Sequence, residues 1–217
     1  EDQINSQIGG NLNLRPETAI TNSLSFLFSD QIELELDFYS ISLKDKIGSA
    51  DASFILNRCL DSGDNYFCNL IERNPTTGTF YEGVGKIASP LLNVSSQKIS
   101  GVDFNLLKTF SVDFGQIRLN NFLSLLLEND VQLRSSIPVE DCKGKYENNC
   151  GLPSPEIQNI FSLDFIYEVS KFDTSTSLIM RYIDGVDDSN SSNPIDFDNY
   201  YYLDANFSIE FTNSINF

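Results

Sequence analysis

Apolar and polar residues alternate along several long stretches of the chain. Residues 31–43 place apolar side chains at even positions, from Ile32 to Phe38, and acidic side chains at odd positions, from Glu33 to Asp37. The same period of two recurs in residues 100–107, 161–169 and 201–211. A helix would spread this pattern around its circumference, so the alternation predicts β-strands with one apolar and one polar face.

The predicted strands are unusually long. At roughly a dozen residues they exceed the ~5 to 6 residues common in globular sheets and reach the ~9 to 11 residues that a tilted strand needs to cross a bilayer. Leucines crowd together in residues 122–127, where periodicity fits a strand or a buried helix, and the flanking strands favour a strand. The expected strands are residues 18–29, 31–46, 92–109, 116–128, 157–169, 174–183 and 199–211.

The connections between these strands alternate between short and long. Short polar turns lie near residues 30, 113, 172 and 213, and long excursions cover residues 48–90, 129–155 and 184–198. Outer-membrane barrels show this asymmetry because their periplasmic turns are tight and their external loops are long. The pattern therefore predicts an all-β fold: an antiparallel transmembrane β-barrel segment of about seven to eight strands, open as a fragment, with long extracellular loops.

The first excursion contains signals for short helices. Asp51 and Asp64 suit N-cap positions for helices over residues 51–59 and 64–71, and Asn74-Pro75-Thr76-Thr77-Gly78 is typical of a turn. At the other end of the chain, residues 212–214 are expected to turn into an eighth strand that starts at Ile215.

Composition narrows the class of protein. The chain has 217 residues, a formal net charge of −17, no His and no Trp, and its length fits one domain or part of one. No run of ~18 apolar residues is present, which excludes a transmembrane helix, whereas a barrel strand escapes this criterion because every second residue faces the lumen. The acidic charge would repel phosphates, so nucleic acid is not an expected partner.

Four cysteines form two close pairs in the irregular segments: Cys59 with Cys68, and Cys142 with Cys150. All four are disulfide candidates, which implies an oxidising compartment. Four cysteines permit three connectivities, and nearest-neighbour pairing is the one that clips each excursion independently. The absence of histidine and the wide spacing within each pair argue against a zinc site.

Residues 10–19, Gly-Asn-Leu-Asn-Leu-Arg-Pro-Glu-Thr-Ala, resemble the segment G-N-x-x-L-x-P-E-T-A that opens a barrel strand in TonB-dependent outer-membrane receptors. Residues 36–41, 100–104 and 202–205 are similar to later strands of that family, in the same order. The spacing from Cys59 to Cys68 is similar to a disulfide loop of one large receptor subgroup. The resemblance spans essentially the whole chain.

The resemblance implies that residues 1–217 are a partial receptor β-barrel domain, because complete barrels of this kind have about twenty-two strands and a plugged lumen. The plug domain and the last strands are expected to be missing here. Glu1-Asp2-Gln3 has neither the basic nor the apolar part of a signal peptide, so the sequence is expected to begin within a protein or after processing.

The implied function is uptake of a scarce ligand, such as a ferric siderophore, cobalamin or glycan, across the bacterial cell outer membrane. The implied partners are outer-membrane lipid, the TonB system acting through the missing plug, and a small-molecule or oligosaccharide ligand, with no cofactor. Polar strand residues are the candidates for the lumen wall, although such walls are polar wherever water or a plug touches them. These candidates are Glu33, Glu35, Asp37, Asp103, Asp164 and Glu168.

Two further clusters have competing interpretations. The acidic loop 184–198 offers oxygen ligands for calcium, but its spacing does not match a calcium loop, and a solvated acidic loop is favoured. Tyr200, Tyr201 and Tyr202 either stack on a ligand or belong to the aromatic girdle at the membrane interface, and the girdle is favoured.

Catalysis finds no support, because the chain has no His for a triad and no carboxylate pair stands out at a fixed separation. The protein is therefore not expected to be an enzyme. The serious alternative to a receptor is a secreted, disulfide-containing β-sandwich binding module or adhesin. Such a module would hide its apolar strand faces in a core, whereas a barrel exposes them to lipid.

Overall fold

The computed structural model describes residues 5–79, 84–132, 137–146, 150–169, 172–188 and 196–210, and only the backbone at residues 49, 94 and 95. The chain divides into two compact units, which are described separately. Unit 1 comprises residues 1–19, 43–96 and 133–137, and unit 2 comprises residues 20–42, 97–132 and 138–217.

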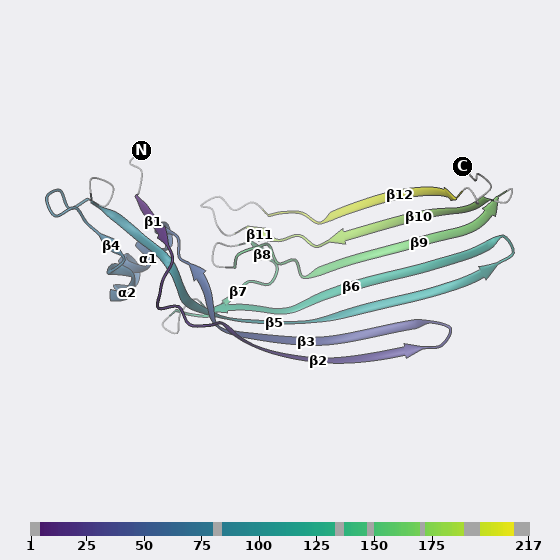
Figure 1. Cartoon of the computed structure of the whole chain (residues 1–217), viewed down its shortest axis with the longest axis horizontal. Helices are drawn as coiled ribbons and strands as arrows, with labels where there is room; N and C mark the ends of the chain where they lie inside the picture. Colours follow the sequence, from purple (N-terminus) through teal and green to yellow (C-terminus); the bar gives the residue numbers. More distant parts are fainter. Residues whose placement is uncertain are drawn as a thin grey trace, which may run out of the picture. The chain divides into compact units, whose positions relative to one another are not determined.

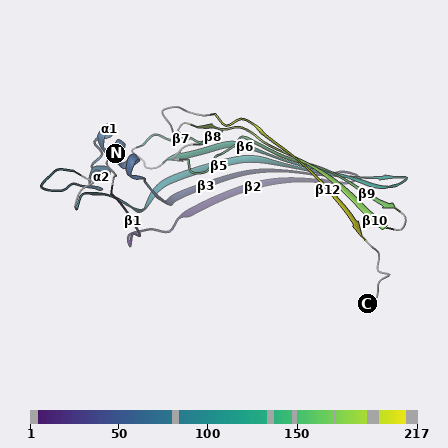
Figure 2. The same ribbon diagram turned by 90° about the horizontal axis from the view of Figure 1, so that it is seen from above.

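Unit 2 is built on long strands in the order β12-β10-β9-β6-β5-β3-β2, so neighbours along the sheet are also neighbours among the long strands of the chain. They lie side by side in Figure 1 and twist together along their length in Figure 2. Strands β3 and β5 also continue into unit 1. The bounds of the seven long strands are β2 Thr18–Ser29, β3 Glu33–Ser49, β5 Lys86–Val112, β6 Gly115–Gln132, β9 Ile157–Val169, β10 Phe172–Ile183 and β12 Tyr200–Glu210.

Each of the seven predicted strands is present, and the all-β prediction is confirmed. The leucine-rich segment 122–127 lies within β6, as the flanking strands indicated. Within the described residues, no helix is long and apolar enough to cross a membrane.

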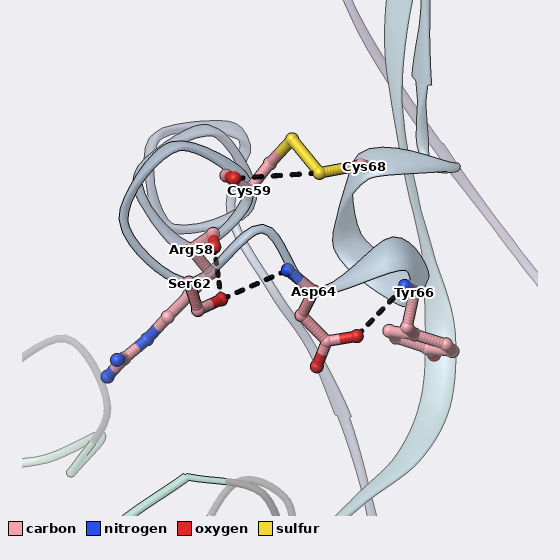
Figure 3. The surroundings of a disulfide bond; sticks show 6 residues. All are labelled: Arg58, Cys59, Ser62, Asp64, Tyr66 and Cys68. Atoms are coloured by element: carbon pink, nitrogen blue, oxygen red, sulfur yellow. Dashed lines mark hydrogen bonds between the residues drawn. A yellow bond between two sulfur atoms is a disulfide. The ribbon is translucent and has the colours of Figure 1, made fainter.

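Unit 1 contains the helical part of the first excursion. Helix α1 (Ala52–Ser62) begins at Asp51, whose side chain accepts a hydrogen bond of 2.8 Å from the Phe54 amide, and it ends at the left-handed Gly63. Helix α2 (Asn65–Cys68) begins at Asp64, whose carboxylate accepts from the Tyr66 amide at 2.9 Å (Figure 3). Both predicted N-caps are confirmed, whereas α2 is shorter than the predicted 64–71.

A small hydrophobic core holds this unit together. Ile55 of α1, Phe67 of α2, Ile87 and Ile137 are all buried and pack into one cluster. The short strands β1 (Ser6–Gly9) and β4 (Ile71–Glu72) both pair with β5 at Ile87, in parallel and antiparallel register respectively. Ile87 is therefore the point at which two strands and the helices meet.

These two pairings explain why the prediction for β5 was wrong at its start. The sequence predicted an excursion up to about Pro90, and proline is unusual inside a sheet because it lacks an amide donor. The strand instead begins at Lys86, since β1 supplies a partner 81 positions away, with Gly9 opposite Pro90. The predicted turn 212–214 and the strand expected after it lie outside the described residues.

Three further short strands lie in the other predicted excursions. Strand β7 (Glu140–Asp141) pairs with β6, and β8 (Lys145–Tyr146) pairs in parallel with β11 (Asp187–Asp188). Two-residue strands carry too little alternation to be recognised in a sequence. In addition, β8 and β11 are paired although they lie 42 residues apart in the chain.

Candidate functional site

The strand register divides the unit 2 sheet into two chemically different faces. Directly opposed residues in antiparallel strands project to the same face, and successive residues project to opposite faces. One row across β6, β9, β10 and β12 consists of Leu119, Leu163, Leu178 and Ala205. The adjacent row on the other face consists of Arg118, Asp164, Ser177 and Asn206. We call these the apolar face and the polar face.

Both faces of the sheet are open in the described residues. On the apolar face, Leu203 is 76% exposed and Phe207 is 64% exposed. A β-sandwich would cover such side chains with a second sheet. The exposure therefore favours the barrel interpretation, in which lipid covers them.

The polar face holds its carboxylates with neighbouring hydroxyl groups. Asp164 accepts a hydrogen bond of 2.5 Å from Oγ of Ser177, and Asp103 accepts one of 2.6 Å from Oγ of Ser124. Glu168 shares the face of Asp164, because it lies four residues along the same strand.

Strand β3 contributes its acidic residues to the same face through an aromatic contact. The ring of Tyr39 lies where a Cβ on Gly101 would point, so Tyr39 shares a face with Asp103, two residues after Gly101. Glu33, Glu35 and Asp37 share a face with Tyr39 by their alternate spacing along β3. The six residues that the sequence singled out thus lie on one face of the sheet.

The three consecutive tyrosines do not share a face. Tyr201 lies opposite Tyr182 on the apolar face, with ring centroids 5.0 Å apart. Tyr200 and Tyr202 lie on the polar face, where their rings are stacked with centroids 6.0 Å apart and an interplanar angle of 18°. A girdle position fits Tyr201 but not the other two, and the alternation of β12 in the sequence already separates them.

Tyr200 and Tyr202 belong to a wider patch on the polar face. Tyr202 is in register with Arg181, Ile160 and Phe122 across the sheet, and Tyr200 is in register with Ile183. All five uncharged members are exposed. We call them the aromatic patch: Phe122, Ile160, Ile183, Tyr200 and Tyr202.

An ion pair lies within this patch. Nη1 of Arg181 is 2.5 Å from Oδ2 of Asp204, and about half of each side chain is buried. Asp204 thus compensates the charge of Arg181, the cation in the row of Phe122, Ile160 and Tyr202. No feature of the sequence identified this pair, because it depends on the register between β10 and β12.

Two disulfides join the four cysteines. The first joins Cys59 to Cys68, with Cα atoms 4.8 Å apart, and the second joins Cys142 to Cys150, with Cα atoms 5.5 Å apart. Among the described residues no cysteine is free. This is the nearest-neighbour connectivity. Figure 3 shows the first bridge, which links α1 to α2 beside the hydrogen bond of 2.5 Å from Oγ of Ser62 to the Arg58 carbonyl.

Asn129 anchors the second disulfide loop to the sheet. Its carbonyl accepts from the Cys142 amide at 2.8 Å, its Nδ2 donates to Oγ of Ser154 at 2.8 Å, and its Oδ1 accepts from Gln97 at 2.8 Å. Asn129 is buried, and so is Cys142. A buried amide whose donor and acceptor are both satisfied rigidifies the segments it joins.

The loops after β6 and β10 pack against each other. The Gly144 carbonyl accepts from the Asp187 amide at 2.9 Å, and the rings of Tyr146 and Phe197 meet edge to face with centroids 6.2 Å apart. An isolated β-bridge between Val186 and Phe197 joins the two ends of the loop after β10. The two long excursions therefore form one structure at this end of the sheet.

Charged groups at the end of β6 influence one another. Glu128 accepts a hydrogen bond of 2.7 Å from Nζ of Lys98, which lowers the pKa of Glu128 and raises the pKa of Lys98. Burial, followed by the charges of Glu128 and Asp141, raises the pKa of Asp130. Counted from Gly115, these groups lie beyond the ~9 to 11 residues that cross a bilayer.

The acidic loop 184–198 shows no convergence on a metal site in the part that the structure describes. Asp184 accepts a hydrogen bond of 2.8 Å from the hydroxyl of Tyr182, and Asp187 and Asp188 form strand β11. Across all described residues, no three potential metal-ligating side chains form a group. In the sequence, Asp196 and Asp198 are separated from Asp187 and Asp188 by residues 189–195, which lie outside the described part.

The whole chain matches the model of a known family. The family model described as TonB dependent receptor-like, beta-barrel, matches residues 1–217. The chain belongs to this family. The TonB-dependent receptor prediction from the sequence is thereby confirmed, and membership implies a barrel of the outer membrane.

One solved structure supports the TonB-dependent receptor fold. The siderophore receptor PirA from Acinetobacter baumannii is 16% identical, with a TM-score of 0.53 over 92% of this chain. At this identity the likeness shows the fold alone. The chain spans 26% of the length of PirA. No curated protein matches the chain.

Proposed function

We propose that this chain forms part of the wall of an outer-membrane receptor that captures a scarce ligand and imports it with energy delivered through TonB. The family match over residues 1–217 carries the proposal. The register supports it, because an apolar face suits lipid and a polar face suits a water-filled or plugged lumen. The predicted lumen candidates, from Glu33 to Glu168, would then line the interior.

We further propose that residues 1–217 are one partial barrel domain, to which a complete receptor adds a plug and further strands. The length comparison with PirA supports this organisation. The plug would connect to TonB, and this chain would contribute strands, clipped loops and part of the ligand surface. No covalent step is involved, so the proposed role is that of a transporter and not of an enzyme.

An uptake experiment tests the proposal. Cells producing the complete receptor, with or without a functional TonB, are given a labelled panel of ferric siderophores, cobalamin and neutral oligosaccharides. We expect accumulation of one compound class that requires TonB and stops when an uncoupler collapses the proton motive force. Secretion of the protein into the medium, or accumulation that is the same without TonB, would contradict the proposal.

A further inference from the structure

The aromatic patch is an anomaly on the polar face. Elsewhere that face carries mainly carboxylates and hydroxyls, including Asp164, Ser177 and Glu168, and its isoleucines Ile166 and Ile179 are only partly exposed. At the end of the sheet near the long loops, however, it presents two aromatic rings, two isoleucines and a phenylalanine. An exposed apolar group of this kind on a face in contact with water commonly marks a binding site.

We propose that the aromatic patch and the Arg181–Asp204 pair form a subsite for an uncharged, hydroxyl-rich ring, specifically a pyranose of a neutral oligosaccharide. This inference rests on the proposed receptor function and names its ligand class. The rings of Tyr200 and Tyr202 are 58% and 48% exposed and nearly parallel. Their negative π-faces suit the weakly positive C–H face of a sugar ring.

The charge pair at the patch argues for a neutral ligand. Arg181 offers hydrogen-bond donors only and Asp204 offers acceptors only. A sugar hydroxyl can therefore accept a hydrogen bond from Arg181 or donate one to Asp204. An anionic ligand would have to displace Asp204 from Arg181 and face the remaining carboxylates of the polar face. A cationic ligand would meet the Arg181 guanidinium in the row of Tyr202.

The patch lies where an entering ligand would arrive. Tyr200 is the first residue of β12 and Ile183 is the last residue of β10, so both adjoin the long loop that connects these strands. The loops of that end are held by the Cys142–Cys150 disulfide and by the Tyr146–Phe197 contact. The patch therefore belongs to the rim of the polar face and not to its turn end.

The test uses the complete receptor in detergent, a glycan array of neutral oligosaccharides, and the variants Tyr200→Ala and Tyr202→Ala. We expect at least one array compound to bind, and its affinity to fall about tenfold or more in each variant, in line with the cost of losing one stacked ring. The variant Tyr202→Phe keeps the ring and should retain binding. Tyr201→Ala, on the apolar face of the same strand, is the matched control and should change affinity less than about twofold.

Several outcomes would overturn the inference. The first is that no neutral oligosaccharide binds, and the second is that Tyr202→Ala binds the oligosaccharide as tightly as the parent receptor does. The third is that the receptor prefers a cationic ligand whose affinity falls steeply between about 50 and 500 mM salt. Loss of heat stability without loss of affinity would show that the patch packs a plug segment. TonB-dependent uptake that persists in Tyr202→Ala would leave the transport proposal intact and refute the subsite alone.

Discussion

Gly101 shows how a single residue decides the packing between two strands. A Cβ at this position would lie against Oη of Tyr39 and the Leu125 carbonyl, closer than real Cβ atoms approach. Glycine leaves the space in which the Tyr39 ring crosses β5. The ring compensates for the packing that a glycine in a strand lacks, as aromatic neighbours do in other sheets.

We expect Gly101→Ala to destabilise the barrel by about 1–3 kcal/mol, because the added methyl group forces the Tyr39 ring or the Leu125 backbone to move. The measurement is urea unfolding of the complete receptor in detergent micelles. Gly9→Ala is the control, since nothing lies within 4 Å of a Cβ at Gly9. Equal midpoints for the two variants would show that the ring accommodates the methyl group without cost.

At the scale of elements, the end of β6 combines a rigid anchor with an unfavourable charge. Asn129 binds the disulfide loop to the strand, while the next residue, Asp130, is opposite Asp141 in the β6–β7 pair. Like charges directly opposite each other destabilise a sheet. The loop is therefore held by the amide network and the Cys142–Cys150 disulfide against repulsion between two carboxylates.

The raised pKa of Asp130 predicts a pH dependence for this loop. The folded loop binds the proton of Asp130 more tightly than the unfolded chain, so its stability rises as pH falls through the folded pKa toward 3.8. Hydrogen exchange of the Cys142 amide, corrected for intrinsic rates, measures this stability. We expect Asp130→Asn to increase the protection of the Cys142 amide from exchange at about pH 7. The further increase in this protection on acidification should be smaller in the variant than in the parent receptor.

Glu128 titrates in the same region with a lowered pKa, so its hydrogen bond with Lys98 weakens on acidification. The difference between Asp130→Asn and the parent receptor at each pH reports Asp130 together with its interaction with Glu128. An identical pH profile for the two proteins would show that neither the burial of Asp130 nor the charges of Glu128 and Asp141 affect the stability of the loop.

For the whole molecule, the two faces of the sheet determine how the chain meets its surroundings. Leu163 and Ser162 are successive residues of β9 and project to opposite faces. Leu163 lies in the central row of the apolar face, between Leu119 and Leu178. If lipid covers this face, the same substitution at these two positions should have very different effects.

We expect Leu163→Arg to cost about 2–4 kcal/mol and to reduce assembly into the outer membrane, because the guanidinium must enter the bilayer interior. Ser162→Arg should assemble normally, since its side chain reaches the polar face. Heat-modifiable migration on a gel, which distinguishes folded from unfolded barrels, measures assembly in isolated outer membranes. Normal assembly of both variants would argue against lipid contact at Leu163.

Local chemistry in the sequence determined the elements of this protein. Alternation identified four of the seven long strands, and the turns and flanking strands indicated the other three. The side chains of Asp51 and Asp64 identified the two helix starts. Each of these signals involves residues only a few positions apart. The residues of the polar face were also predictable, since side-chain direction in a strand follows from position alone.

Tertiary structure alone decided the features that depend on register and on distant partners. The extension of β5 to Lys86 requires β1, the aromatic patch requires the alignment of β6, β9, β10 and β12, and the Arg181–Asp204 pair requires that of β10 with β12. A shift of one residue in any of these registers would move a side chain to the opposite face. The sequence therefore determines which faces exist, and the strand pairing determines which side chains meet on them.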